Sequence, residues 1–386
     1  MDATTEFDDA LPPAARDLIA RGRAFAHEVV APAAAGWDHD RVHPREALRA
    51  ASLQGLASVE ISPAHGGLGL PFGANLRLVE EIAEIDWSFA FALINHHNAA
   101  ARIANAGIRA TIDRWLPPML AGERLGASGL SEPEAGSDFA SIRTRAERIA
   151  GSWTLEGAKH WVASARDADV FVTYAQTQPG ARGRGIACFL VDAARAGFVR
   201  SEPVSMPGLH AAGIGGYRLQ GYVALDAELL QPAGDAFKQT MQGVNKARAY
   251  IAAMAAGVVA DSLRRALDWS GRREAFGSKL IEHQGLRWSL AGVATTLEAM
   301  RLLAYRAASL IDRGEDAVQA AAIAKKFAGE NCLPAVAACA QALGARGITE
   351  DEGLTRQLAA ARAVAYADGT TEMMNERIGA GLRGGR

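Results

Sequence analysis

Ser128-Gly-Leu-Ser-Glu-Pro-Glu-Ala-Gly-Ser-Asp138 marks the point at which the residue pattern of the chain changes. Before this stretch, apolar residues rich in Ala and Leu recur at helical spacing. After it, short runs of β-branched and aromatic residues are separated by Gly, Asp and Pro. After its first residue, Ser128, the stretch holds two further small hydroxyl residues, Ser131 and Ser137, with a proline and two glycines. Such residues suit a plain helix-to-strand connection, and they also let backbone N–H groups approach a phosphate or a polar ring closely. We therefore treat the stretch as a domain boundary and a candidate binding loop.

The length and composition indicate a large globular protein. The chain has 386 residues, 49% of them hydrophobic, which is enough for a large core and two or three domains. A formal net charge of −2 argues against nucleic-acid binding, and three cysteines are too few for a disulfide framework. The acidic N-terminus is unlike a targeting peptide, and the longest apolar run, Ala249–Ala260, is shorter than the roughly 20 residues of a membrane span. We expect a cytoplasmic protein with neither a nucleic-acid nor a membrane partner.

The middle of the chain reads as a small antiparallel β domain. Four short runs there are rich in β-branched and aromatic residues, and turn-forming residues separate them. They are Trp153–Glu156, Val170–Tyr174, Ile186–Val191 and Tyr217–Leu225.

Helical periodicity frames this region on both sides. It runs from about residue 11 to 122 and returns from Phe237, with long helices at roughly 281–313 and 316–343 and a last one from about 353. The pattern predicts an α+β fold with segregated layers. Its parts are an N-terminal all-α domain (1–122), a middle antiparallel β domain (123–235) and a C-terminal α domain resembling a four-helix bundle (236–386).

Two histidine-bearing segments admit a binding or a structural interpretation. Trp37–Pro44 gathers two His and two Asp residues, but it ends in a proline and reads as a loop between helices, so we predict no metal site there. Asn95-His-His-Asn98 interrupts an apolar helix. His96 and His97 could be satisfied core groups or could contact a ligand.

The octapeptide Ser131–Asp138 resembles the (Thr/Ser)-Glu-Pro-x-Ala-Gly-Ser-Asp signature of acyl-CoA dehydrogenases. In that family the loop binds FAD and an acyl thioester together. The resemblance implies that Leu130, Ser131, Gly136 and Ser137 contact the flavin. It also implies that Ser128 and Ser137 contact the thioester.

A second motif, Gly157-Ala-Lys-His-Trp-Val-Ala163, resembles the Gly-x-Lys-x-Trp-Ile-Thr strand of the same family. The resemblance implies that Trp161 lies against the isoalloxazine, where a flat apolar ring excludes water. A tryptophan packed in a sheet core is the alternative. Ala163 stands where the family usually has a threonine near flavin N5, so one hydroxyl donor is missing.

Two further stretches resemble family motifs that bind the FAD of a neighbouring subunit. Arg273–Gln284 is similar to Arg-x-x-Phe-Gly…Gln, and Gln341–Gly347 to Gln-x-x-Gly-Gly-x-Gly, with Ala345 in place of the second glycine. A guanidinium suits a pyrophosphate because it donates two parallel hydrogen bonds. The implied FAD contacts are Arg273, Phe276, Gln284, Gln341 and Gly344, and the implied assembly is a homotetramer, a dimer of dimers.

Tyr366-Ala-Asp-Gly-Thr-Thr-Glu372 resembles the Tyr-Glu-Gly-Thr segment that carries the family's catalytic base. The resemblance makes Asp368 the base, Gly369 a substrate contact, and Thr370 and Glu372 flavin contacts. Arg248 matches an arginine beside the base and would be catalytic and substrate-binding, with Asn245 as a further substrate contact. Some relatives carry the base one residue before that arginine, at the position of Ala247 here.

The resemblance implies FAD-dependent dehydrogenation of an acyl thioester carried by CoA or by an acyl-carrier protein. Asp368 would remove the α-proton while hydride leaves for flavin N5, and an electron-transfer flavoprotein would accept the electrons. His96 and His97 would then lie near the acyl end and favour a branched, cyclic or aminoacyl group.

Asp368 is one methylene shorter than the usual glutamate, which leaves several alternatives. The substrate could sit deeper in the site, or the chemistry could be 1,4-dehydrogenation of a cyclic acyl thioester or nitroalkane oxidation. Asp368 could also be structural in a homologue with altered chemistry. A flavin oxidase on the same scaffold is a further alternative.

Overall fold

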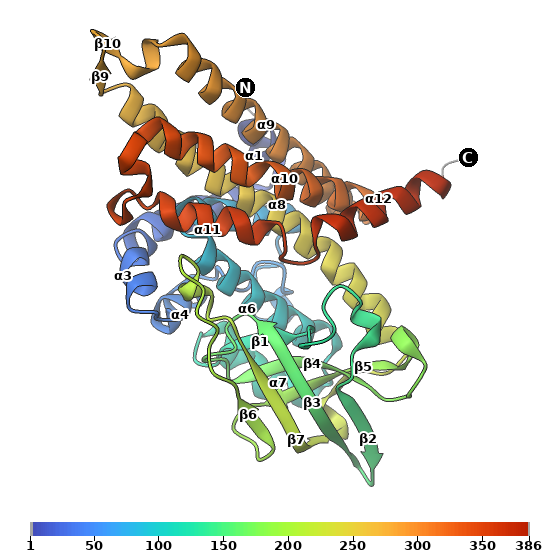
Figure 1. Cartoon of the computed structure of the whole chain (residues 1–386). Helices are drawn as coiled ribbons and strands as arrows, with labels where there is room; N and C mark the ends of the chain where they lie inside the picture. Colours follow the sequence, from blue (N-terminus) through green and yellow to red (C-terminus); the bar gives the residue numbers. More distant parts are fainter. Residues whose placement is uncertain (1–2, 385–386) are drawn as a thin grey trace.

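The computed structural model describes residues 3–384 and has three parts, shown in Figure 1. A group of helices comes first, a twisted β-sheet lies at one end of the molecule, and a bundle of long helices lies at the other. This arrangement confirms the predicted α+β fold. Residues 1, 2, 385 and 386, at the ends of the first and third predicted domains, lie outside the described residues.

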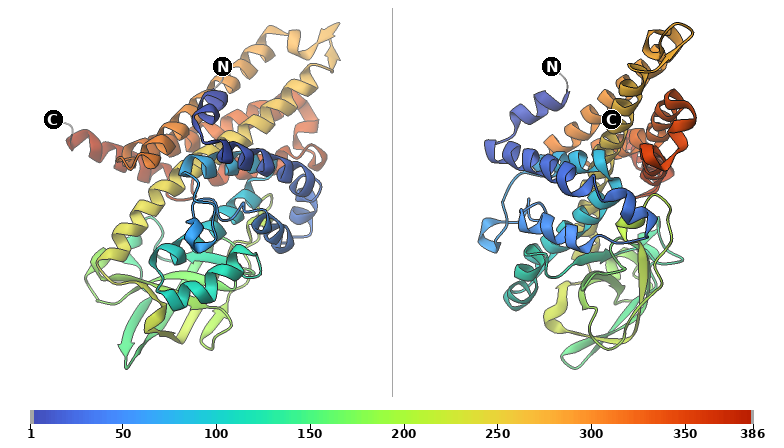
Figure 2. Two further views of the ribbon diagram at one scale, coloured as in Figure 1. Left: turned by 180° about the vertical axis from the view of Figure 1, so that it is seen from behind. Right: turned by 90° about the vertical axis from the view of Figure 1, so that its left-hand side faces the viewer.

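The N-terminal helices pack between the sheet and the bundle (Figure 2). They are α1 (Ala3–Ala10), α2 (Pro13–Phe25), α3 (Ala34–His39), α4 (Arg45–Leu53), α5 (Phe72–Ile85), α6 (Trp87–Ala106) and α7 (Arg109–Leu120). Pro13 stands in the first turn of α2, where its missing N–H has no cost. Asp86 begins α6 as an N-cap, since its carboxylate accepts a hydrogen bond from the N–H of Phe89 at 2.9 Å.

The middle part is one mixed sheet in the order β6-β7-β3-β2-β4-β5-β8. Its strands are β1 (Gly126–Gly129), β2 (Arg145–Ile149), β3 (Ser152–Val162), β4 (Val170–Gln176), β5 (Ile186–Asp192), β6 (Phe198–Arg200), β7 (Gly215–Leu225) and β8 (Leu229–Gln231). All neighbouring pairs are antiparallel, except that β1 runs parallel to β4 and β2 meets β4 at one parallel position. The parallel β1 carries the chain from α7 into the loop at Ser128–Asp138.

The C-terminal part is built on the helix α8 (Asp235–Ser270), which at 1.5 Å per residue is about 54 Å long. It runs from the sheet to a hairpin at the far end of the bundle (Figure 1). The remaining elements are β9 (Glu274–Ala275), β10 (Ser278–Lys279), α9 (Gln284–Asp312), α10 (Val318–Leu343), α11 (Leu354–Val364) and α12 (Thr371–Gly384). Within residues 3–384, no helix combines the length and the hydropathy that a membrane crossing requires.

The single last helix predicted from about residue 353 is two helices, so that prediction is wrong. α11 ends at Val364 and α12 begins at Thr371. Between them Asp368 has φ 54° and Gly369 has φ 109°. A right-handed helix cannot continue through left-handed backbone, and Asp and Gly are among the residues that adopt it most readily. The break therefore lies at the residue that the sequence predicts as the base.

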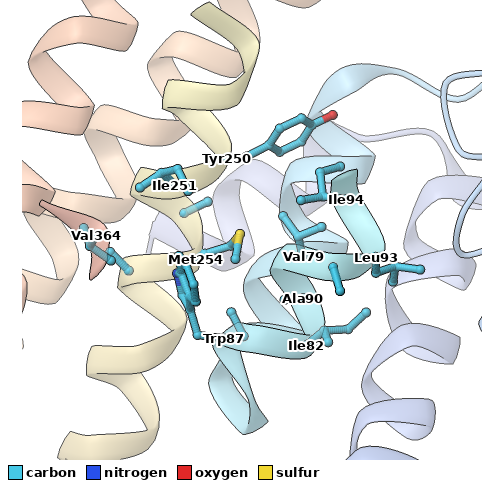
Figure 3. Packing of buried hydrophobic residues seen from close by; sticks show 14 of the residues in the cluster. Val79, Ile82, Trp87, Ala90, Leu93, Ile94, Tyr250, Ile251, Met254 and Val364 are labelled. Carbon is cyan, nitrogen blue, oxygen red and sulfur yellow. The ribbon is translucent and has the colours of Figure 1, made fainter. Parts of the chain in front are cut away.

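The core crosses the boundary between the first and third parts. Figure 3 shows Met254 of α8 pointing toward Val79 of the N-terminal helices, with Ile82 and Leu93 deeper among those helices and Ile251 on the other side of α8. All five side chains are buried. The N-terminal helices and α8 therefore share one hydrophobic core, which fixes the position of α8 relative to the sheet.

A buried ion cluster fastens α1, α2 and α9 to α5. Arg77 is fully buried and contacts Asp8 at 2.8 Å, Glu80 at 3.1 Å and Glu81 at 2.5 Å. Arg23 pairs with Glu81 at 2.8 Å, and Arg301 of α9 pairs with Glu80 at the same distance. The cluster holds three arginines and three carboxylates, so its charges balance.

Two glutamates of α5, Glu81 and Glu84, make opposite contributions to the dependence of stability on pH. Burial raises the pKa of Glu84 to about 7, and the charges of Glu81 and Asp261 add to the shift. Burial would also raise the pKa of Glu81, but hydrogen bonds from Arg23 and the charge of Arg77 lower it to about 2. Between pH 4.5 and 7 the folded state holds more protons at Glu84, so stability falls as the pH rises. Below pH 4.5 the unfolded state holds more protons at Glu81, so stability falls with the pH.

Relative to Glu84→Gln, the wild type should therefore lose stability between pH 5 and pH 8, because the neutral amide does not titrate. By linkage, Glu84 accounts for up to about 3 kcal/mol of this change. Thermal melts of both proteins between pH 4 and 8 test this. A difference between the two thermal midpoints that stays constant from pH 5 to pH 8 would contradict the prediction.

Candidate active site

The loop after β1 is fixed to strand β3 by a buried ion pair. Glu132 lies in the loop and Lys159 in β3, and both side chains are buried. Lys159 Nζ donates to Glu132 Oε1 at 2.8 Å and to the carbonyl of Leu130 at 3.2 Å. Burial lowers the pKa of Lys159 to about 8, although the charge of Glu132 opposes the shift. The pair sets the position of Leu130, one of the predicted flavin contacts.

The same loop has a rigid inner half and an open outer half. The N–H of His160 donates to the carbonyl of Ser131 at 3.0 Å, so this residue is also tied to β3. Ser128 is half-buried, whereas Gly136 and Ser137 are exposed. A Cβ added at Gly136 would meet nothing within 4 Å, so a ligand can approach the backbone there.

Trp161 stands at the end of β3 and points out of the sheet. Its side chain is 57% exposed and its φ is 59°, so it is not a packed core tryptophan. Ala163 and Ser164 behind it are buried. His43 bonds Ser164 Oγ at 3.2 Å and Asp167 at 3.0 Å, which anchors the turn from inside. A large aromatic face is thus left uncovered next to an anchored turn, beside the loop that carries Ser131.

Asp368 lies in the turn between α11 and α12. Arg248 of α8 is buried next to this turn, since a Cβ added at Gly369 would lie 3.9 Å from its Nη2. Arg248 Nη1 donates to Asn245 Oδ1 at 2.9 Å, and its Nε is buried without a partner. The structure therefore brings together Asp368, Gly369, Arg248 and Asn245.

The carboxylate of Asp368 is half-buried and carries no hydrogen bond from any residue between 3 and 384. Burial raises the pKa of Asp368, while the positive charges of Lys325 and Arg248 oppose this shift. Burial in turn lowers the pKa of Arg248, and the charge of Arg377 acts in the same direction. The result is an unpaired carboxylate whose proton affinity is above that of an ordinary aspartate, which suits a general base.

Thr370 and Glu372 lie just beyond this turn. Thr370 caps α12, because its Oγ1 accepts from the N–H of Met373 at 3.3 Å. Glu372 is exposed in the first turn of the same helix. Both residues are therefore next to Asp368 along the chain but on its outer side.

The other predicted cofactor contacts lie at the far end of the bundle. Arg273 and Phe276 belong to the β9–β10 hairpin, Gln284 begins α9, and Gln341 and Gly344 end α10. All five are exposed. Phe276, between β9 and β10, is 100% exposed with φ 53°.

The hairpin cannot serve the site at Arg248 in the same chain. Ser270, at the end of α8, lies 22 positions after Arg248 in continuous helix, which is about 33 Å. Figure 1 shows the hairpin at the end of α8 away from the sheet. The two groups of predicted contacts therefore lie apart and form two separate candidate half-sites.

His96 and His97 lie inside the N-terminal core. His96 is buried, and its Nδ1 accepts from the N–H of Gly126 at 3.0 Å while Nε2 lies 3.1 Å from the carbonyl of Met119. Burial lowers the pKa of His96 to about 4, so the ring is neutral. His97 is buried and accepts from the N–H of Glu60 at 3.3 Å. His96 therefore has no ring nitrogen left for a ligand, which favours the structural interpretation of this residue.

The segment Trp37–Pro44 is also held by contacts within the fold. Asp38 bonds His210 Nδ1 at 2.7 Å and the N–H of Gly208 at 3.0 Å. Across the residues that the structure describes, His, Cys, Asp and Glu side chains nowhere form a group of three that could hold a metal ion.

Reading the sequence missed three residues that shape the site. Glu132 and Lys159 lie within the motifs, but the sequence does not show that they pair across 27 residues. Lys325 is fully buried below the turn of Asp368. One feature of the sequence could have identified it: Lys325 lies within the apolar run Val318–Ala328 of a predicted helix, and a buried charge requires hydrogen-bonding or charged partners.

Comparisons with known proteins match one family over almost the whole chain. The family models described as "Acyl-CoA dehydrogenase, N-terminal domain", "middle domain" and "C-terminal domain" match residues 12–123, 127–221 and 234–383. An "Acyl-CoA dehydrogenase" of Bacillus subtilis is 30% identical over 364 residues, covering 94% of this chain and 96% of the relative.

Solved structures agree with these matches. Butyryl-CoA dehydrogenase from Megasphaera elsdenii superposes with a TM-score of 0.93 at 26% identity, covering 97% of this chain and 99% of that one. A glutaryl-CoA dehydrogenase from Mycobacterium smegmatis in complex with FADH2 gives 0.92 at 26% identity, covering 98% and 96%.

Proposed function

Because this chain belongs to the acyl-CoA dehydrogenase family, we propose that it dehydrogenates an acyl thioester with FAD as cofactor and Asp368 as base. The observation that carries the proposal is the turn between α11 and α12. It presents an unpaired, half-buried carboxylate beside Arg248, and burial raises the pKa of that carboxylate. Raising the pKa of a carboxylate toward the working pH is how a general base of this type becomes effective.

The residues present fit a bound FAD. Trp161 offers an uncovered aromatic face, and the loop tied to β3 at Ser131 offers the hydroxyls of Ser131 and Ser137 and an open backbone at Gly136. When bound, FAD would supply the acceptor for the hydride that leaves Cβ of the acyl group. The neighbour that carries FADH2 supports this assignment.

Asp368 would take the α-proton of the thioester, so that a Cα–Cβ double bond forms as the hydride leaves. The α-proton is acidic enough only if donors polarise the thioester carbonyl. In the described part of the chain, no hydrogen bond leads from the N–H groups of Asp368 or Gly369, so both can donate to a ligand. Arg248 and Asn245 would fix the substrate and the charge on the base, and the unpartnered Nε of Arg248 is a spare donor there.

The distance between the two half-sites supports a homotetramer. Arg273 and Phe276 lie beyond Ser270, which is about 33 Å along α8 from Arg248, so they would bind the FAD of a neighbouring subunit together with Gln341. In such an assembly the ring of Phe276, which is fully exposed in the single chain, would be buried against the neighbouring subunit and its FAD. Closed symmetric assemblies are the usual way in which such reciprocal contacts are satisfied. An electron-transfer flavoprotein is the acceptor we propose, and the thioester is carried by CoA or by a carrier protein.

Anaerobic bleaching of the bound flavin tests the function. The protein should purify yellow, with about one FAD per chain. A panel of butyryl-, isobutyryl-, octanoyl- and cyclohexenyl-carbonyl thioesters, each on CoA and on an acyl-carrier protein, should include at least one that reduces the flavin within seconds. Product analysis then separates the α,β-enoyl thioester from the product of 1,4-dehydrogenation, which the short side chain of Asp368 makes the second candidate. A colourless, folded protein, or a yellow one that no thioester bleaches, would overturn the proposal.

A further inference from the structure

Lys325 is a fully buried lysine with no carboxylate partner in the described part of the chain. It lies on α10, and its Nζ donates to the carbonyl of Val364 at 2.6 Å and to the carbonyl of Gly369 at 3.1 Å. A buried ammonium is costly unless hydrogen bonds and charges compensate it. The hydrogen bonds that compensate the burial of this ammonium therefore all go to one short backbone segment, between Val364 and Gly369.

The two accepting carbonyls stand at either end of the turn that carries Asp368. Val364 is the last residue of α11, and its carbonyl belongs to the helix end, where carbonyls lack partners and a cation is favoured. Gly369 follows Asp368 directly, and both have left-handed backbone. Such backbone persists at a non-glycine residue only when its surroundings hold it. Lys325 supplies that support from below.

The lysine holds the turn without occupying the carboxylate. Asp368 accepts no hydrogen bond from Lys325, whose Nζ donates to the two carbonyls instead. A direct pair would use an oxygen lone pair and would lower the proton affinity strongly. Lys325 affects the carboxylate itself only through its positive charge, which together with that of Arg248 opposes the effect of burial on the pKa of Asp368. The charge of Asp368 likewise opposes the shift by which burial lowers the pKa of Lys325 to about 8.

We propose that Lys325 is a positioning residue for Asp368: it clamps the turn at Val364 and Gly369 so that the carboxylate points at the substrate while staying free to accept a proton. This inference rests on the proposed function, in which Asp368 is the base. A displacement of about 1 Å in a reacting group can cost on the order of 10²-fold in rate. The clamp is therefore expected to matter for proton removal and much less for binding.

Lys325→Met tests the clamp, since methionine keeps most of the length and loses the charge and the donors. Lys326→Met is the matched control, because Lys326 is the next residue on α10 and pairs with Glu330 at the surface. For each variant, anaerobic reduction of the flavin is measured from pH 5.5 to 9 with butyryl-CoA and with the fastest thioester of the panel. Binding of crotonyl-CoA is measured in parallel, because it requires no proton transfer.

Lys325→Met should slow flavin reduction 10- to 100-fold and change crotonyl-CoA affinity by less than threefold. The acid limb of its rate profile should move to higher pH, because the pKa of Asp368 rises when a neighbouring positive charge is removed. Arg248 of α8, with Arg377 behind it, remains as the other positive charge around the turn. Lys326→Met should match the wild type. If Lys325→Met loses its FAD, Lys325→Gln serves instead, with the same expected shift.

Wild-type rate with an unshifted acid limb in the Met or Gln variant would overturn the role of Lys325. A loss of rate that only follows loss of FAD or of affinity, with an unshifted limb, would overturn it as well. Asp368→Asn is run alongside. If that variant keeps the wild-type rate, the proposed base is wrong and Lys325 positions no base. If it is inactive, the result for Lys325 stands on its own.

Discussion

Asp368→Asn should abolish flavin reduction by acyl thioesters while leaving FAD and thioester binding in place. The amide keeps the shape of the side chain but cannot accept a proton. Removal of a general base typically costs 10²- to 10⁴-fold, and more when no other group takes the proton. The carboxylate has no hydrogen-bond partner in the described part of the chain, so the exchange disturbs no contact that the fold needs. Stopped-flow reduction under anaerobic conditions measures the rate.

Glu376→Gln is the control for this variant, because it removes an exposed carboxylate from the adjacent helix α12. It should retain the wild-type rate. An Asp368→Asn protein that still bleaches its flavin at nearly that rate would show that Asp368 is structural and that the proton leaves by another route.

The variant Asp368→Glu tests why this position has the shorter side chain. The φ of 54° at this position favours Asp, which adopts left-handed backbone far more often than most residues. If the turn accommodates Glu, the longer side chain should speed reduction by straight-chain acyl-CoAs. If the true substrate sits deeper in the site, the same change should slow its reduction. The ratio of the two rates distinguishes these cases.

Arg273→Ala should weaken FAD retention and assembly together. Arg273 is exposed in this chain and far from Trp161, so its proposed partner is the pyrophosphate of FAD in a neighbouring subunit. A hydrogen bond to a charged group contributes about 1.5–3 kcal/mol. Losing the contact should therefore lower FAD affinity by about 10- to 100-fold. Dialysis followed by absorbance gives the FAD content, and sedimentation velocity gives the assembly state.

Arg272→Ala supplies the control, since Arg272 is the preceding residue and is exposed. Among residues 3–384, its side chain bonds only the carbonyl of Asp268 at the end of its own helix. It should keep its flavin and its assembly. An Arg273→Ala protein with full FAD content and an unchanged sedimentation coefficient would show that the hairpin does not reach a cofactor.

Much of the fold could be predicted from the sequence, because periodicity and turn residues act locally. The runs around Trp153, Val170, Ile186 and Tyr217 all lie in strands of one sheet. The break at Asp368 was missed because alanine-rich sequence continues on its N-terminal side, and the left-handed turn depends on contacts from α10.

The candidate site was less accessible to sequence reasoning, because its parts are far apart along the chain. The motifs identify Trp161 and Asp368, but not the lysines beneath them. Lys159 reaches Glu132 across 27 residues, and Lys325 reaches Gly369 across 44. The burial of His96 depends on β1 and α7, which no local pattern around that residue reveals.

The length of α8 has a consequence for mixtures of chains. Arg248 lies within α8 and Arg273 lies just past its end. The helix between them is about 33 Å long, so the two residues cannot contact the same part of one bound cofactor. On the proposed assembly, each chain therefore donates its base to one catalytic centre and its hairpin to another. Two defective chains, one lacking Asp368 and one lacking Arg273, would complement each other when paired. In such a pair one centre inherits both defects and the other inherits neither, so half of the centres are intact although both parent chains are defective.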